Sequence, residues 1–500
     1  MSDEYLVPRG SFAPLSRTGL LFGLSKTQLI VAAIAVARPV LQIVLLRNIA
    51  GGLYSLIWWT LPLAVLAVGS YRGRSYLSMV LITGTFFLRK IGRQTFAVPN
   101  LRVKHDDMAI EMPGPWRERS KILPMLNVSY LPAGAAFIYD RSKDNPTATA
   151  VLRVETEAWL FADEQAKAAR IQAVSDMCKE LAATVGIERV ALLARTYAGS
   201  SKLLPKPKLY AEDSYVGEFA RADYAEMMAT TKMGASLHRD VLIAITLSLK
   251  KAGPEIAAEG GQVAGVSKVL ATKVRRVVEM LPACGVRSED LTVRSRWLSA
   301  GEIRGAIKLA LAPDAAGFLE QNGWSVPAGT MLQTYAKERL DYLITDGGFH
   351  RAWWIDQWPA VDATAGFLYP LVAQGETPHT FTQVWQPVDL YDSEKRWHND
   401  VMSRETSAAL QQALGRPTST THRAEGADMG LRFQEMQLGY GDVNYSGWLV
   451  VHANTMEELN KSNSWVKQST VGMRIGLARG RQLATFNTAA LPLGYRDEAA

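Results

Sequence analysis

The chain has 500 residues, of which 48% are hydrophobic, and its formal net charge is +7. Residues 1–104 contain 12 Lys and Arg and only 2 Asp and Glu, so the rest of the chain has a net charge of −3. A nearly neutral body lacks the electrostatic footprint of a DNA- or RNA-binding domain, so no direct contact with nucleic acid is expected.

Two apolar runs open the chain. The first extends roughly from Leu20 to Ile49 and the second from Leu53 to Val68, with Ala50-Gly51-Gly52 between them. A helix that crosses a bilayer needs about 20 mostly apolar residues. The runs therefore predict a transmembrane hairpin over residues 20–70, with its turn at the two glycines, after an N-terminal cytoplasmic tail at residues 1–19.

An intramembrane charge, Arg38, interrupts the first run and is followed by Pro39. A charge at the centre of a bilayer costs about 2.5–3.5 kcal/mol on insertion scales. Three interpretations stay open. Arg38 faces a partner subunit, or the span shifts to Leu20–Ala37 and Arg38 reaches an interface, or a kink at Pro39 divides the span from an interfacial piece.

Basic residues lie before and after the hairpin, which predicts that both termini are cytoplasmic at the inner (plasma) membrane. A third apolar run, Tyr76–Leu88, is short for a span. We expect residues 71–95 to form a helix on the membrane surface, although a third span is the alternative. The basic residues expected to contact anionic lipid there are Arg72, Arg74, Arg89, Lys90 and Arg93.

The soluble part is predicted to be α+β. Residues 96–147 read as a small β segment or linker. In residues 148–333 a strand at Ala148–Glu155, a helix at Glu164–Val185 and a strand at Glu188–Thr196 form a β-α-β unit. Further elements of this first domain are a strand at Val241–Leu249 and helices at Val263–Leu281 and Ser299–Leu309.

A second α+β domain is predicted for residues 334–500. It starts with a strand-turn-strand over Leu343–Asp356, whose turn lies at Asp346-Gly347 or Gly347-Gly348. The other predicted elements are strands at Phe381–Pro387 and Trp448–Ala453 and helices at Ser393–Leu414 and Thr455–Ala478. The fold class is thus a transmembrane hairpin followed by two ferredoxin-like α+β cytoplasmic domains.

Motifs for catalysis, cofactors or metals are weak, and we expect none of these sites. Residues 260–268 have the glycine spacing of a phosphate loop, but Val266 stands where the loop needs its lysine. His238 with Asp240 imitates a catalytic pair, although capping of the next strand is the simpler interpretation. Cys178 and Cys284 fall in apolar helical patterns, which favours buried thiols over a disulfide or a metal pair.

An aromatic cluster lies in the second domain. It contains Phe349, Trp353, Trp354 and Trp358. Aromatic side chains dominate cores and interfaces alike. Core packing of a hairpin is the favoured interpretation, and a protein–protein hot spot is the alternative that makes this cluster a candidate partner surface.

In layout the chain resembles integral membrane proteins of actinobacterial conjugation and type IV secretion loci. Their soluble region is similar to the N-terminal, non-motor half of the VirB, TrbE and CagE group of secretion ATPases. The segments that carry this resemblance are Arg89–Arg93, Val151–Thr196, Gly348–Pro359, Trp448–Ala453, Met456–Leu459 and Gln482–Gly494.

The resemblance implies a non-enzymatic inner-membrane scaffold. The motor domain of those ATPases would follow Ala500, and residues 260–268 have no Walker lysine, so a separate motor ATPase is the expected partner, with other membrane subunits in an oligomeric assembly. The EccE component of type VII secretion is similar in layout alone. The alternatives are a membrane-tethered enzyme centred on His238 and Asp240 or on residues 260–268, and a phage or mobile-element membrane protein.

Overall fold

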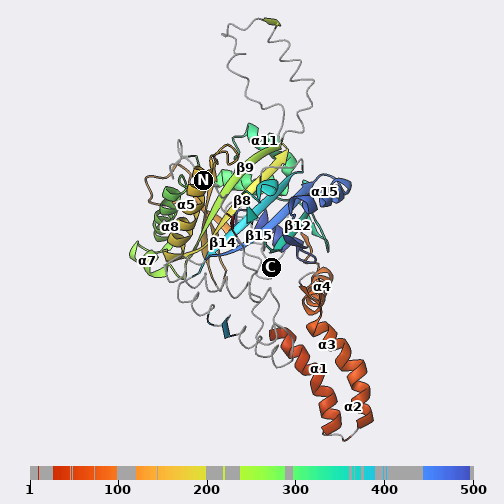
Figure 1. Cartoon of the computed structure of the whole chain (residues 1–500). Coiled ribbons are helices and arrows are strands. Elements are labelled where there is room, and N and C mark those ends of the chain that lie inside the picture. The colour runs from red at the N-terminus through yellow and green to blue at the C-terminus, as the bar shows by residue number, and fades with distance from the viewer. Residues whose placement is uncertain are drawn as a thin grey trace, which may run out of the picture.

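The computed structural model describes most of the soluble body and the apolar N-terminal helices. The described residues are 9–10, 26–44, 47, 49–71, 74–97, 120–142, 145–198, 218–219, 237–287, 297–359, 363–364, 366–372, 377–388, 398, 401–402 and 443–495. They form a mixed body of helices around one large antiparallel sheet, from which a pair of helices projects (Figure 1). Most of the predicted tail at 1–19 and of the predicted helix at Ser393–Leu414 lies outside the described residues.

The projection contains two helical stretches side by side. Helix α1 (Lys26–Val44) is followed by α2 (Ile49–Ser55), the π-helical η1 (Leu56–Thr60) and α3 (Leu61–Val68), which continue one another without a break. The predicted turn at Ala50–Gly52 is wrong, because these residues are helical and the chain reverses between Val44 and Ile49. Both glycines are therefore interior helix positions.

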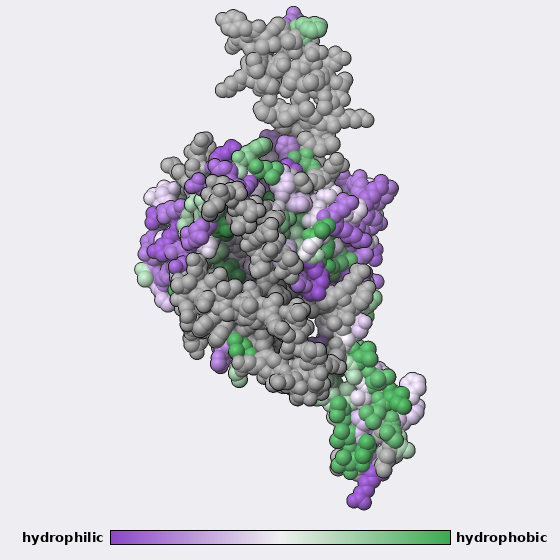
Figure 2. Space-filling model, in the orientation of Figure 1, coloured by the Kyte–Doolittle hydropathy of each residue, from purple (hydrophilic) through white to green (hydrophobic). Residues whose placement is uncertain are grey.

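One helix among the described residues, at Thr27–Val44, is long and apolar enough to cross a membrane. The second apolar helix, Leu53–Ala67, is shorter than a full candidate span. Hydrophobic residues cover most of the visible surface of the projection, whereas much of the coloured surface of the body is hydrophilic (Figure 2). Such a continuous apolar surface is unusual on a soluble protein.

Twelve described strands form the main sheet, and all neighbouring pairs are antiparallel. The strands follow one another across the sheet as β4 (Phe96–Ala97), β10 (Ala336–Glu338), β11 (Leu343–Thr345), β12 (Gly348–Gln357), β15 (Val443–Ala453), β14 (His379–Pro387), β8 (Ile187–Ala198), β9 (Leu237–Ser248), β7 (Thr147–Val154), β6 (Ala136–Asp140) and β5 (Ser120–Pro124). The twelfth strand, β16 (Arg474–Leu477), lies beside β12.

Two strand triplets with the same connectivity meet in the middle of the sheet. In the first triplet β9 lies between β7 and β8, and in the second β15 lies between β12 and β14. The triplets join where β8 pairs with β14, from Thr196 opposite His379 to Val190 opposite Trp385. The two predicted α+β regions therefore share one continuous sheet, and β5 and β6 extend it rather than forming a separate β segment.

Helices cover both faces of this sheet. On one face α5 (Glu164–Ala183), α7 (Gly253–Ala258) and α8 (Gln262–Met280) pack on the first triplet, and α12 (Tyr369–Val372) and α15 (Met456–Ser469) pack on the second. The opposite face is covered by α10 (Ala300–Leu311), α11 (Ala316–Gln321) and α16 (Gln482–Ala489). Alternation along each strand divides its side chains between these two cores.

Local signals explain most of these elements. The Asp163 carboxylate accepts the Ala166 amide at 2.6 Å and begins α5, and Ser299 with Glu302 and Thr455 with Glu458 form capping boxes that begin α10 and α15. The predicted helix over Thr455–Ala478 is wrong after Ser469, because the chain turns at Gly472 with a φ of 83° and then forms β16.

Candidate functional site

Hydrogen bonds between side chains and backbone hold the two projecting helices in register. Gln28 Nε2 donates to the Ala67 carbonyl at 2.7 Å, and Thr60 Oγ1 donates to the Ala35 carbonyl at 2.9 Å. The second bond has a clear reason. Pro39 has no N–H, so the carbonyl of Ala35, four residues earlier, has no donor within its own helix. Thr60 supplies the missing donor, so the Ala35 carbonyl is hydrogen-bonded.

The charge at Arg38 also has a contact on the neighbouring helix. Its guanidinium carbon lies 4.7 Å from the centre of the Trp59 ring, a cation–π geometry, and the side chain is otherwise exposed. Among the described residues no carboxylate pairs with Arg38. Trp59 and Thr60 thus accommodate Arg38 and Pro39, the two residues of α1 least suited to an apolar helix.

Helix α4 (Tyr76–Ile91) joins the projection to the body. Arg89 in its last turn donates from Nη1 to Glu338 on β10 at 3.1 Å and from Nη2 to the Gly480 carbonyl. The Glu338 carboxylate is fully buried and also accepts the Leu483 amide in the first turn of α16 at 3.2 Å. Burial raises the pKa of Glu338, and the neighbouring Arg89 partly opposes that rise.

This junction changes the role predicted for the basic residues. Arg89 is directed to the body and not to a membrane surface, because the buried Glu338 carboxylate needs a counter-charge. Lys90 and Arg93 are exposed, and Lys90 lies 5.9 Å from the Phe87 ring. Arg74 begins the short strand β3 (Arg74–Ser75), and Arg72 lies outside the described residues. Tyr76–Leu88 is helical as predicted.

The four residues of the aromatic cluster pack against the hydrophobic cores on both faces of the sheet. Trp353 and Trp358 are 7% and 4% exposed, and Phe349 packs against the same hydrophobic cluster between the sheet and α15. Trp354 points to the opposite face and packs beside α16. Trp353 and Trp358 are therefore core residues, as the core-packing interpretation predicts. Phe349 and Trp354 are half-buried at the edges of the two cores, so a partner surface at these two residues stays a prediction.

Residues 260–268 do not present a phosphate loop. Gly260 and Gly261 have φ values of 96° and 63° and form the turn before α8. Ser267 is fully buried, donates to the Val263 carbonyl at 2.8 Å and accepts the Leu126 amide at 3.1 Å. Its hydroxyl thus ties a loop to a helix, and nothing in this geometry favours a nucleotide.

Asp240 belongs to an arginine–aspartate cluster with Arg153 and Arg195. Its carboxylate pairs with Arg195 and lies 3.5 Å from Arg153, and these guanidinium groups hold its pKa below the usual value despite burial. His238 instead stacks on Tyr197, with ring centres 6.0 Å apart. An Asp engaged by two arginines is a poor general base. The two residues therefore do not form the catalytic pair of the alternative hypothesis.

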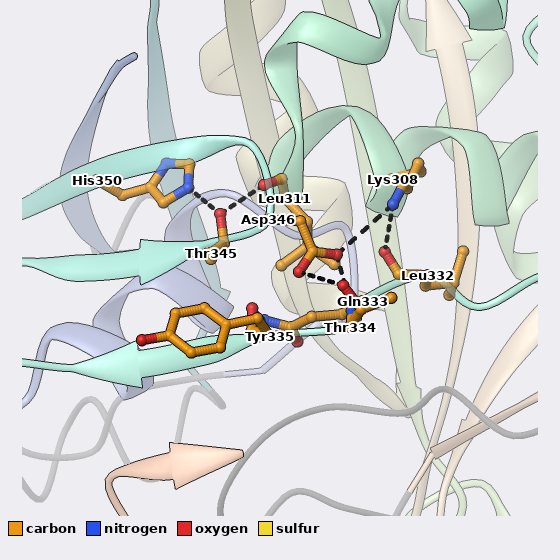
Figure 3. A network of polar contacts seen from close by, with 9 residues as sticks. All are labelled: Lys308, Leu311, Leu332, Gln333, Thr334, Tyr335, Thr345, Asp346 and His350. Carbon is orange, nitrogen blue, oxygen red and sulfur yellow. Dashed lines mark hydrogen bonds and ion pairs between the residues drawn. The ribbon is translucent and has the colours of Figure 1, made fainter. Parts of the chain in front are cut away.

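Next to this cluster lies a buried histidine chain, formed by Thr345, His350, His452 and Thr380. The two Nδ1 atoms of the histidines are 2.7 Å apart, His350 Nε2 is 2.5 Å from Thr345 Oγ1, and His452 Nε2 is 3.1 Å from Thr380 Oγ1. Thr345 also donates to the Leu311 carbonyl at 2.6 Å, so its oxygen accepts from His350 (Figure 3).

These partners assign every proton of the chain. His350 carries its proton on Nε2 and accepts at Nδ1, so His452 carries its proton on Nδ1 and accepts at Nε2 from Thr380. Each ring nitrogen then has one partner while both rings stay neutral. Burial agrees with this assignment, since it lowers the pKa of His350 to about 3 and that of His452 well below its usual value.

A second network connects the histidine chain to α10. Asp346, in the turn between β11 and β12, accepts the Thr334 amide at 2.7 Å and the Thr334 hydroxyl at 2.9 Å (Figure 3). Lys308 on α10 lies 3.8 Å from Asp346 and donates to the Leu332 carbonyl at 3.1 Å. The turn that carries Thr345 is thereby fixed to the helix above it.

Sequence spacing did not indicate the histidine chain, because His350 and His452 lie 102 positions apart. A signal was present in the residues next to His452, which follows Leu449, Val450 and Val451 in a buried strand. A histidine in such a strand must be neutral and hydrogen-bonded, because burial of an unpaired polar group is costly.

The described residues contain no group of three or more His, Cys, Asp or Glu placed to hold a metal ion. Cys178 and Cys284 are free thiols, half-buried beside the core of the first triplet. Comparison with known proteins gives no match, either to a family model or to a curated protein.

Proposed function

We propose that this protein is a non-enzymatic scaffold of the inner membrane, with two spans and cytoplasmic termini, which seats the motor ATPase of a type IV secretion or conjugation machine. The observation that carries the proposal is the junction at α4. A helix that leaves an apolar hairpin is attached to a folded body through an ion pair between the half-buried Arg89 and the buried Glu338. A loosely tethered enzyme has no need of such a rigid connection, whereas a platform that transmits position does.

Continuity of the second helical stretch supports a two-span hairpin. From Ile49 to Val68 the chain is helical throughout, which corresponds to about 30 Å at 1.5 Å per residue. That length is close to the thickness of a bilayer's hydrocarbon core. The Gln28–Ala67 hydrogen bond aligns the ends of the two helices, and the absence of acidic residues between positions 5 and 105 suits this location.

The order of the strands supports two ferredoxin-like halves. In the second half the strands lie in the order β16, β12, β15, β14, so the fourth strand is next to the first and the third lies between the first and second. In the first half, isolated bridges from Val286 to Thr156 and from Trp297 to Leu152 occupy the place of the fourth strand. Fused halves of this kind present a broad helical surface suited to a large partner.

Recovery of partners tests the scaffold. The tagged full-length protein is extracted from its native host in mild detergent, and the proteins that accompany it are identified by mass spectrometry. We expect a motor ATPase and other membrane subunits. A control variant, Glu457→Gln on the exposed face of α15, should recover the same set. Repeated recovery of the protein as a monomer without an ATPase would contradict the scaffold proposal.

Cysteine labelling tests the topology. In a background of Cys178→Ser and Cys284→Ser, Arg47→Cys places a thiol between the two helical stretches, and Val471→Cys places one on the exposed body. A membrane-impermeant maleimide added to intact spheroplasts should label position 47 and spare position 471 until the cells are lysed. Equal labelling of both positions in intact spheroplasts would refute the hairpin orientation.

A further inference from the structure

Arg38 has an incomplete environment within the hairpin. Its guanidinium rests on the Trp59 ring at 4.7 Å, but the side chain is exposed on the outside of the two-helix unit. A π face offsets only part of a cationic charge. In a bilayer such a charge needs an anionic partner or a route to the interface.

No carboxylate of the hairpin can fill that role. Residues 5–105 contain neither Asp nor Glu, so neither this hairpin nor the hairpin of a second copy supplies a counter-charge. The nearest abundant anions at the edge of a membrane are the phosphate groups of phospholipids. Arginine binds phosphate through two parallel N–H groups, and a guanidinium stacked on an aromatic ring keeps those edges free.

The position of Arg38 along α1 selects the leaflet. Val44 ends the helix six residues after Arg38, which corresponds to about 9 Å, whereas Lys26 lies about 18 Å away in the other direction. A long side chain can cover much of the shorter distance by extending along the helix to the interface.

We infer that Arg38, supported by the face of Trp59, binds the phosphate group of a phospholipid in the leaflet opposite the two termini. This inference rests on the two-span hairpin proposed above. The site is prepared before the lipid arrives, because Trp59 Nε1 approaches the Ile34 carbonyl at 3.5 Å and Thr60 fixes the adjacent turn. The bound lipid then supplies the charge that the hairpin lacks.

Native mass spectrometry measures this binding directly. The full-length protein in mild detergent is titrated with phosphatidylglycerol, and the affinity of the tightest lipid is compared between variants. Arg38→Gln should lower the affinity for the tightest-bound lipid by about tenfold, as expected for the loss of one charge-assisted contact. Arg38→Lys, which keeps the charge but loses the planar fork, should give an intermediate affinity.

Matched controls separate this site from general charge. Arg47→Gln removes one positive charge just beyond the end of α1 and should leave the affinity for the tightest-bound lipid unchanged. Diacylglycerol, which has the acyl chains but no phosphate, should bind wild type and Arg38→Gln equally, and added inorganic phosphate should not displace phosphatidylglycerol.

Other results would contradict the inference. Equal phosphatidylglycerol affinity of Arg38→Gln and wild type would overturn it, and loss of a co-purifying membrane subunit in that variant would instead assign the contact to a partner's carboxylate. Flotation of the full-length protein with phosphatidylglycerol vesicles distinguishes failure of the Arg38 site from failure of the membrane hairpin. If wild type does not float, the membrane hairpin itself is wrong, whereas flotation with unchanged lipid affinity rejects only the Arg38 site.

Discussion

Two buried polar clusters, the arginine–aspartate cluster and the histidine chain, lie on the same face of the sheet and are stabilised in different ways. The arginine–aspartate cluster on the first triplet balances buried charges against one another, whereas the histidine chain on the second triplet stays neutral and depends on the order of its donors. Arg195 and Thr380 are cross-strand neighbours, so the two groups meet at the β8–β14 junction. Loss of one partner leaves a buried charge uncompensated in the charged cluster, whereas in the neutral chain it leaves a buried hydrogen-bonding group unpaired, at a smaller cost in stability.

The largest effect is expected for Asp240→Asn. The substitution keeps the shape of the side chain but leaves the buried Arg195 and the half-buried Arg153 without their anion. Removal of one partner from a buried ion pair typically costs about 3–5 kcal/mol. Unfolding of the full-length protein in mild detergent by guanidinium chloride, followed by tryptophan fluorescence, measures this loss. Glu457→Gln, in an exposed pair with Lys461, should change stability by less than about 0.5 kcal/mol and is the control.

Lower pH should destabilise the histidine chain and leave the charged cluster unaffected. The folded state keeps His350 and His452 neutral because their pKa values are depressed, while the unfolded chain protonates them below about pH 6.5. The free energy of unfolding therefore falls as pH decreases from 6.5 to 5.5, by up to about 1.4 kcal/mol per pH unit for each histidine. Equilibrium unfolding at a series of pH values checks the slope, and a flat profile in this window would contradict neutral histidines.

Thr345→Val should lower the free energy of unfolding by about 2–3 kcal/mol. Valine keeps the shape but removes the acceptor for His350 Nε2–H and the donor to the Leu311 carbonyl, so two buried groups lose their partner. The same guanidinium chloride unfolding measures the change. A near-zero effect would mean that the proton order assigned to the chain is wrong at its Thr345 end.

Thr380→Val should lower the free energy of unfolding by less, about 1 kcal/mol. At this end of the chain the substitution leaves only His452 Nε2, an acceptor, without its donor. The comparison of the two threonine variants is informative because the amino-acid change is identical. If Thr380→Val were the more damaging of the two, the hydrogen bonds would have to run in the opposite direction.

Periodicity and capping signals were sufficient for individual elements. The β7-α5-β8 unit, β9, α8, α10 and the β11–β12 turn lie close to where the sequence pattern predicts them. These features depend on residues close in sequence, so local physical chemistry decides them. Helix α16 was not predicted, since its buried face includes the polar residues Gln482, Thr485 and Asn487 and gives no amphipathic stripe.

Features that depend on contacts between distant segments could not be predicted from local sequence patterns. Whether the two α+β regions form separate sheets or one depends on the register between β8 and β14, which no local pattern specifies. The destination of Arg89 is similar, because a basic residue after an apolar run suits a lipid surface as well as a buried carboxylate 249 positions away. The aromatic cluster was ambiguous for the same reason.

The β8–β14 junction has a consequence for the modularity of the chain. Seven residue pairs join the halves there, so a truncation between them would leave two long strand edges with unpaired N–H and C=O groups. Exposed edges of this kind promote association with other chains. We therefore expect neither half to be soluble when expressed alone, whereas co-expression of both fragments should restore one particle. The body is in this sense indivisible, as the scaffold proposed above requires.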